Sequence, residues 1–180
     1  MPLIKQMVSS KSNEWATPQR LYDYLDSIFN FTLDPCATDD NHKCDKYYTI
    51  NDDGLTKNWG GQVVFMNPPY GGNTRAWLEK AEQERHNKTT TVCLIVSATD
   101  RTYWHDVIDD NADEIWFMRG RVKFGNMPTT APFASAIVIF RPNKNRGIKK
   151  FIDIREYHQG KQPAPTTPNK DSKLINGGEK

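Results

Sequence analysis

The sequence predicts one α/β domain built on an open sheet that is mostly parallel, has an antiparallel C-terminal strand and carries helices on both faces. Segments of strand character alternate with segments of helical periodicity, which is typical of this fold class. Residues 91–97 form a continuous apolar run, which indicates a strand buried on both faces in a parallel sheet covered by helices. With 180 residues, the chain has room for one sizeable core and not for a second catalytic domain.

The N-terminal third is predicted to contain one helix and three short strands. Thr17 and Pro18 provide a hydroxyl N-cap and a proline at the first helical position, which is a common helix start. Apolar side chains then recur at helical spacing up to Phe29, so this helix is expected to pack on the core. Short strands are expected at residues 31–33, 47–50 and 63–66.

The rest of the domain continues this alternation. Asn73 is expected to cap a helix that carries Trp77 and Leu78, and a further helix is expected at residues 102–108. Strands are expected at residues 114–118 and 134–140. The domain is therefore assigned to residues 15–158, after an arm of residues 1–14 and before a polar tail of residues 159–180 that is expected to be disordered.

Charge is distributed unevenly along the chain, although the net charge is only +2. Residues 119–150 contain Arg and Lys without any Asp or Glu, which suits a polyanion such as DNA. Residues 34–53 are mainly acidic, which suits a cationic or hydroxyl-rich small molecule. The two segments therefore predict two different binding partners.

The cysteines indicate a reducing compartment. There are 3 of them, an odd number, and the sequence has neither a signal peptide nor a long apolar stretch. We therefore expect a cytoplasmic protein with no membrane segment. Cys36, His42 and Cys44 lack a second ligand pair at a usable spacing, so no metal site is expected.

The tetrapeptide Asn67-Pro68-Pro69-Tyr70 carries the most specific chemistry. It follows a predicted strand, and ligands of open α/β sheets bind at the carboxyl ends of strands. Its prolines have no N–H, so the loop offers the Asn67 side-chain oxygen and backbone carbonyls beside the ring of Tyr70. The exocyclic amine of a nucleobase has two N–H donors and a ring to stack. The motif therefore predicts methylation of a base amine.

A base amine is inaccessible to an enclosed pocket while the base is stacked, so the target is expected to flip out of the duplex. Tyr70 is expected to stack on the flipped base, and Phe124 is the candidate for a second aromatic face. Arg119, Arg121 and Lys123 lie beside Phe124 in the basic segment and are expected to contact phosphates.

Taken in order, the motifs of this chain resemble those of the compact phage-type Dam family of DNA adenine N6-methyltransferases. The resemblance covers roughly residues 15–140 and rests on Trp15-x-Thr17-Pro18, Leu33-Asp34-Pro35-x-Ala37, Asp53-Gly54-Leu55, Asn67-Pro68-Pro69-Tyr70, Trp77 and Arg119-Gly120-Arg121. It implies a Rossmann-like S-adenosylmethionine-dependent methyltransferase sheet, double-stranded DNA as partner, and N6 of adenine as the target.

The resemblance also implies roles for individual residues. The catalytic residues would be Asn67, Pro68, Pro69 and Tyr70. The cofactor-binding residues would be Trp15, Thr17, Pro18, Asp34, Pro35, Cys36, Ala37, Asp52, Asp53 and Asn67. The nucleic-acid-binding residues would be Tyr70, Arg119, Arg121, Lys123 and Phe124.

Other readings of the sequence stay open at this point. One is methylation of another planar amine: guanine in RNA, cytosine N4 or a protein glutamine. Glutamine methyltransferases usually have a Gly-rich loop after the first strand, where this chain has Pro35-Cys36-Ala37. A different class of function is a DNA-binding module without catalysis, and cofactor binding would separate the two.

Overall fold

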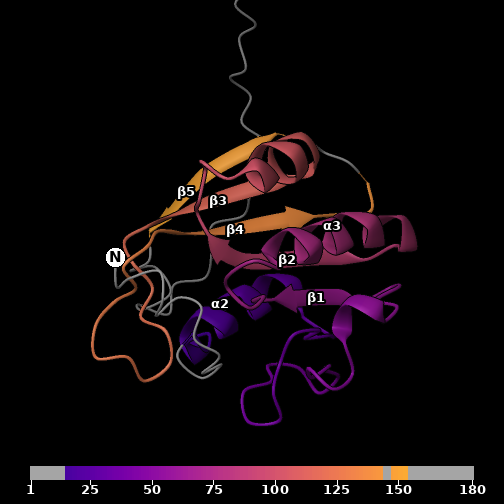
Figure 1. The fold of residues 1–180 in the computed structure, drawn as a ribbon, viewed down its shortest axis with the longest axis horizontal. Coiled ribbons are helices and arrows are strands. Elements are labelled where there is room, and N and C mark those ends of the chain that lie inside the picture. The colour runs from indigo at the N-terminus through magenta and orange to yellow at the C-terminus, as the bar shows by residue number, and fades with distance from the viewer. Residues whose placement is uncertain (1–14, 144–146, 154–180) are drawn as a thin grey trace, which may run out of the picture.

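A mixed sheet forms the centre of the computed structural model, which describes residues 15–143 and 147–153. In this part of the chain the sheet has 5 strands in the order β1-β2-β4-β3-β5 (Figure 1). The strands are β1 Val63–Met66, β2 Thr90–Val96, β3 Glu114–Arg119, β4 Ser135–Phe140 and β5 Ile148–Asp153. The helices are α2 Gln19–Phe29, α3 Thr74–Glu84, the π-helix η3 Trp104–Asp109 and the short 3₁₀ turns η1 Gly54–Thr56 and η2 Arg85–Asn87.

The strand directions agree with a mostly parallel sheet. β1 pairs in parallel with β2, and β3 pairs in parallel with β5. β4 lies between β2 and β3 and is antiparallel to both. β4 is also the last strand that the sequence predicts, so the expected antiparallel strand is found where it was predicted. The edge strand β5 was not predicted, because half of its side chains are exposed and they carry no apolar pattern.

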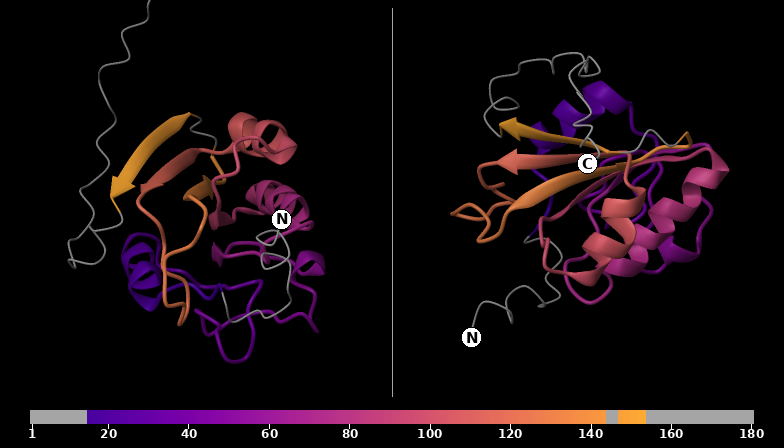
Figure 2. Two further views of the ribbon diagram at one scale, coloured as in Figure 1. Left: turned by 60° about the vertical axis from the view of Figure 1, so that its left-hand side comes forward. Right: turned by 90° about the horizontal axis from the view of Figure 1, so that it is seen from above.

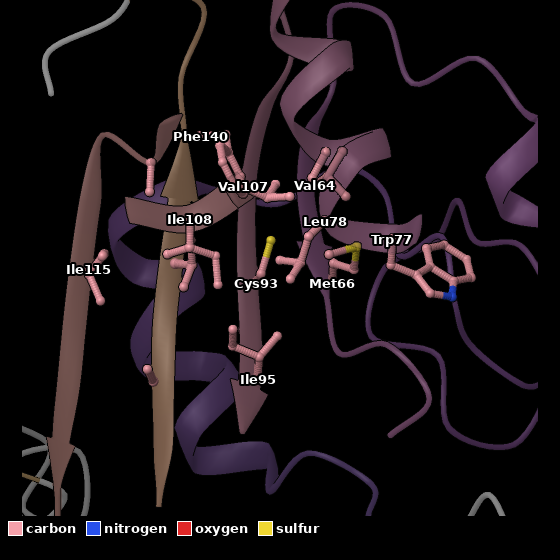
Figure 3. Close-up of a cluster of buried hydrophobic side chains, with 14 of the residues drawn as sticks. Val64, Met66, Trp77, Leu78, Cys93, Ile95, Val107, Ile108, Ile115 and Phe140 are labelled. Carbon is pink, nitrogen blue, oxygen red and sulfur yellow. The ribbon is translucent and has the colours of Figure 1, made fainter. Parts of the chain in front are cut away.

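Helices cover both faces of the sheet, as expected (Figure 2). Side chains of β1 and β2 alternate between the faces, as strand geometry requires. Met66 and Cys93 pack with α3 and η3, and Figure 3 shows Leu78 of α3 and Ile108 of η3 directed at them. Phe65 packs on the opposite face, with α2. The predicted Rossmann-like α/β class is therefore confirmed.

The first two predicted strands are wrong as regular elements. Only isolated bridges form, between Leu33 and Val64 and between Asp34 and Tyr47. Beside these bridges, side chains accept backbone N–H groups: Asp34 accepts from Lys43 in the intervening loop, and Asp52 accepts from Thr49, which lies within the predicted second strand. Such local side-chain acceptors compete with sheet pairing. The chain therefore turns away from the sheet and forms loops at its edge.

The helix starts also differ slightly from the prediction. α2 begins at Gln19, one residue late, because Pro18 is extended (ψ 134°) and acts as the N-cap. Thr17 does not cap this helix. Asn73 occupies the N-cap position of α3 as predicted, but its side chain makes no capping hydrogen bond. Residues 104–109 are helical near the predicted position, in π-helical form.

A buried ion pair holds together the end of the sheet opposite the carboxyl end of β1. Arg85 Nη2 lies 2.5 Å from Asp113 Oδ2, and both side chains are 1% exposed. Arg85 also donates to the backbone carbonyls of Asn111 and Arg141, and Asp113 accepts the Arg141 backbone N–H. These bonds tie the end of α3 to the segments around β3 and β4.

Replacing Arg85 with Met should lower the free energy of unfolding by roughly 3–5 kcal/mol, because Asp113 would keep a buried charge without its partner. Arg75→Met is the matched control, since Arg75 pairs with Glu79 and Asp106 at the surface, where ion pairs contribute little. Denaturant unfolding measures both variants. Equal losses in the two would contradict the structural role of the buried pair.

Candidate active site

The predicted tetrapeptide forms a loop directly after β1, at the carboxyl edge of the sheet. Pro68 is buried and Pro69 is exposed, while Asn67 and Tyr70 are partly buried. Open α/β sheets bind their ligands at this edge. The loop therefore lies where a ligand site is expected in this fold.

The side-chain amide of Asn67 is held by the segment before α2. Its Nδ2 donates to the backbone carbonyl of Trp15 and to Oγ1 of Thr17, each at 3.0 Å. A carbonyl can only accept, so the atom facing Trp15 has to be the nitrogen. Oδ1 is left buried, without a hydrogen-bond partner among the described residues. A buried acceptor without a partner is unfavourable by itself, which suggests that a ligand completes it.

Four aromatic rings cluster beside Asn67. The ring of Trp15 lies 4.9 Å from Phe133, 5.6 Å from Phe124 and 6.0 Å from Tyr70, measured between centroids. Tyr70 lies 6.0 Å from Phe124 and 5.4 Å from Phe133. The Tyr70 hydroxyl and Trp15 Nε1 are buried without a hydrogen-bond partner in the described part of the chain. Like Asn67 Oδ1, these two atoms are buried polar groups that no described residue satisfies.

Phe133 was not predicted as a site residue, because it lies in the loop before β4, where no periodic pattern marks it. Phe124, expected to face a flipped base, is fully buried in the cluster. Contact between Phe124 and a base would require the surrounding rings to move. Its role stays a prediction.

The loop at residues 34–37 packs beside the end of β1. Asp34 is 5% exposed, and its carboxylate accepts backbone N–H groups of Cys36 and Lys43 at 3.4 Å and 3.1 Å. The Ala37 N–H donates to the Tyr48 carbonyl, and the Tyr48 N–H donates to the Asp34 carbonyl. Burial raises the pKa of Asp34 to about 6, although the two N–H groups oppose this change. The Asp34 carboxylate thus stabilises the conformation of this loop through its hydrogen bonds.

A close approach at Gly54 joins this loop to the turn that carries Asp52 and Asp53. A Cβ placed on Gly54 would lie 2.0 Å from the Pro35 carbonyl oxygen, so only glycine fits. Oδ2 of the Asp52 carboxylate accepts from the backbone N–H and the hydroxyl of Thr49. Asp53 is exposed and its carboxylate makes no hydrogen bond with the described residues. Of the two acids, Asp53 is therefore the one whose carboxylate oxygens are both free of hydrogen bonds to the described residues.

Cys36 lies against the loop of residues 67–70, where the Asn67 backbone N–H faces its thiol. Burial and the neighbouring Asp34 raise the pKa of Cys36 well above its usual value. The group is a neutral thiol at physiological pH, and a neutral thiol is a poor nucleophile. Its position fits packing at the site, without a covalent role.

The predicted phosphate contacts lie beyond the aromatic cluster. Arg119 ends β3, and the side chains of Arg121 and Lys123 are exposed in the loop that follows, with no ion pair to the described residues. The Gly125 N–H donates to the Ala16 carbonyl at 2.7 Å. This bond attaches the basic loop to the segment that holds Asn67.

Neither a metal site nor a membrane span is found in the described residues. No group of three or more His, Cys, Asp or Glu side chains in residues 15–143 and 147–153 is placed to hold a metal ion. No helix in the same ranges is long and apolar enough to cross a bilayer.

The sheet, with ligand-facing loops at its carboxyl edge, has the fold of class I methyltransferases. The structure is similar to that of a Listeria monocytogenes protein described as a class I S-adenosylmethionine-dependent methyltransferase, with a TM-score of 0.53 and 12% sequence identity. The similarity covers 86% of this chain and 70% of the Listeria chain. At this identity it shows the fold alone.

The chain belongs to the DNA N-6-adenine-methyltransferase (Dam) family, whose sequence profile matches residues 5–163. It is 36% identical over 158 residues to the DNA N-6-adenine-methyltransferase of Haemophilus phage HP1, covering 82% of this chain and 90% of the relative. It is 32% identical over 104 residues to the enzyme of that name from Escherichia phage T1, covering 56% of this chain and 42% of the relative. The resemblance seen in the sequence is therefore confirmed.

The raised pKa of Asp34 predicts a pH dependence of stability. The folded chain holds this proton up to about pH 6, whereas an ordinary Asp releases it near 3.8. Stability should therefore fall as pH rises between these values, by roughly 3 kcal/mol at most from this group.

Asp34→Asn should remove that part of the pH dependence, measured as the free energy of unfolding across the same interval. Asp40→Asn, at an exposed position in the same acidic segment, should keep the wild-type dependence. The burial effect at Asp34 is disproved if the wild type and Asp34→Asn show parallel curves.

Proposed function

We propose that this DNA adenine-N6 methyltransferase takes its methyl group from S-adenosylmethionine and acts on an adenine flipped out of double-stranded DNA. One observation carries the proposal: Asn67 Oδ1 is a buried acceptor without a partner among the described residues. The Pro68 carbonyl, next in the chain, accepts no hydrogen bond from those residues either. Two adjacent free acceptors match the two N–H donors of an amine.

These acceptors would compensate for the weak nucleophilicity of the adenine amine. The lone pair of the adenine amine is delocalised into the ring, so the nitrogen is a weak nucleophile. Asn67 Oδ1 and the Pro68 carbonyl would each accept one N–H and stabilise the positive charge that develops on nitrogen. They would also fix the direction of the amine, which lowers the entropic part of the barrier. Direct transfer of this kind needs no protein nucleophile, in agreement with the neutral Cys36 thiol.

The chemistry of the loops fits S-adenosylmethionine. The free, exposed carboxylate of Asp53 suits ribose hydroxyls, and the residue lies next to the loop of Asp34, Pro35, Cys36 and Ala37. Trp15, Thr17 and Pro18 would adjoin the methionine part. When bound, S-adenosylmethionine supplies an electrophilic methyl group on a positively charged sulfur. The buried carboxylate of Asp34 in this loop favours such a cation.

The aromatic cluster suits a flipped base. Tyr70 is partly exposed and adjoins Asn67, so its ring can stack on a base whose amine reaches Oδ1. Arg119, Arg121 and Lys123 would hold the phosphates of the duplex beside this cluster. Stacking would offset part of the few kcal/mol that unstacking costs.

The proposal is tested by replacing Asn67 with Ala. Turnover should fall on the order of 10²–10³-fold, by analogy with the loss of one preorganised donor or acceptor at a reacting centre. The dissociation constant for S-adenosylmethionine should stay nearly unchanged, because Oδ1 is assigned to the target amine. Methylated DNA is digested to nucleosides and weighed by mass spectrometry, which also identifies the base.

Asn73→Ala is the matched control, since Asn73 is exposed and its side chain makes no capping bond. It should keep wild-type turnover and yield N6-methyladenine. Methylation by Asn67→Ala at the wild-type rate would refute the assignment of Oδ1. A wild-type product of N4-methylcytosine would refute the choice of adenine.

The basic loop makes a separate prediction about DNA binding. Replacing both Arg121 and Lys123 with Gln should reduce the slope of log affinity against log salt by roughly two, because each lost phosphate contact removes about one. The double variant of Arg20 and Lys46, also exposed, changes net charge equally and should leave the slope unaltered. Fluorescence anisotropy of labelled duplex at several salt concentrations measures both. If the slopes of both double variants match the wild type, DNA lies elsewhere.

A further inference from the structure

We infer that Thr17 is a positioning residue for catalysis: its hydroxyl, with the Trp15 carbonyl, fixes the amide of Asn67 so that Oδ1 faces the target amine. This inference rests on the proposed function. It assigns Thr17 a contact to the Asn67 side chain, where the family resemblance implied only a contact to the cofactor. The motivating observation is the pair of hydrogen bonds from Asn67 Nδ2, each 3.0 Å long.

The orientation of this amide decides whether the site can work. An Asn side chain can turn over and exchange its oxygen and nitrogen with little change in shape. In the reversed orientation, Nδ2 would point N–H groups at an amine that is itself a donor. The Trp15 carbonyl opposes reversal, because it would then face an oxygen.

Thr17 completes this arrangement by accepting the second N–H of Nδ2. With one hydrogen on the Trp15 carbonyl and the other on Thr17 Oγ1, the amide has no N–H left to direct at the ligand. Without the Thr17 hydroxyl, one N–H would be unsatisfied and the amide would lose one of its two anchors. Thr17 thus acts through Asn67, without touching the reacting atoms.

The two acceptors are themselves held in place. Thr17 is 5% exposed, and the next residue, Pro18, begins α2 by accepting the Leu21 N–H. On the other side, the Ala16 carbonyl accepts the Gly125 N–H at 2.7 Å, and the Trp15 ring packs in the aromatic cluster. A positioning group is effective only if its own position is fixed. Residues 15–17 meet this condition, because α2 holds them on one side and the Gly125 bond and the aromatic cluster hold them on the other.

Thr17→Val keeps the shape of the side chain and removes the hydroxyl, whereas Thr17→Ser keeps the hydroxyl. In the Val variant, kcat for adenine methylation should fall about tenfold, as expected for one hydrogen bond of typical strength. The dissociation constants for S-adenosylmethionine and for duplex DNA should change less than about twofold. The Ser variant should recover most of the lost kcat.

A second measurement uses the unmodified protein and does not depend on turnover. In ¹⁵N-labelled wild-type chain, both side-chain amide hydrogens of Asn67 should exchange with solvent more slowly than those of the exposed Asn73. The Asn67 signals are identified by their loss in Asn67→Ala. In Thr17→Val, if it folds, one of the two hydrogens should exchange faster.

Several outcomes would overturn the inference. Wild-type Asn67 hydrogens that exchange as fast as those of Asn73 would show that the anchoring bonds are missing. Weaker cofactor binding by Thr17→Val with unchanged kcat would assign Thr17 to the cofactor. A Ser variant as slow as the Val variant would indicate a packing role. Failure of the wild type to methylate adenine would overturn the proposed function and this inference together, whereas unchanged kcat in Thr17→Val overturns this inference alone.

Discussion

The arrangement of the site depends on a single side-chain amide. Asn67 stands at the end of β1, and its nitrogen is bound by the segment that precedes α2. The oxygen of the same amide is thereby left buried and unfilled among the described residues. The strand β1, the segment before α2 and the loop of residues 67–70 thus meet at one group. An enclosed acceptor of fixed direction is what stabilisation of a developing positive charge requires.

The parts of the fold that are buried in the sheet could be predicted from sequence. Residues 91–97 and 134–140 are continuous apolar runs, and they form β2 and β4 within one residue of the expected bounds. The loops at residues 31–50 could not be predicted, because composition does not show that Asp52 accepts the Thr49 N–H, which a strand at residues 47–50 would use, or that Asp34 accepts the Lys43 N–H in the loop between the bridges. β5 was not predicted, because it is an edge strand on which Ile148 and Phe151 are exposed, and no apolar pattern marks it in the sequence.

The motifs of the site could likewise be found in the sequence, but their contacts could not. The local composition of residues 67–70 and of residues 34–37 indicates the chemistry of each segment. The bonds from Asn67 to Trp15 and Thr17, however, span 52 and 50 positions, and only the folded chain brings them together. Asp52 is hydrogen-bonded to Thr49, whereas the Asp53 carboxylate has no hydrogen bond to the described residues. Composition does not reveal this difference, because either side chain could close the turn.

A crystal structure with duplex DNA and sinefungin, an unreactive analogue of S-adenosylmethionine, would show whether Asn67 binds the target amine. We expect an adenine outside the stack, with its N6 about 3 Å from both Asn67 Oδ1 and the Pro68 carbonyl oxygen. Nδ2 should still be bound by Trp15 and Thr17. An adenine amine directed away from Asn67, or an Asn67 amide turned over with Nδ2 toward the base, would refute this role of Asn67.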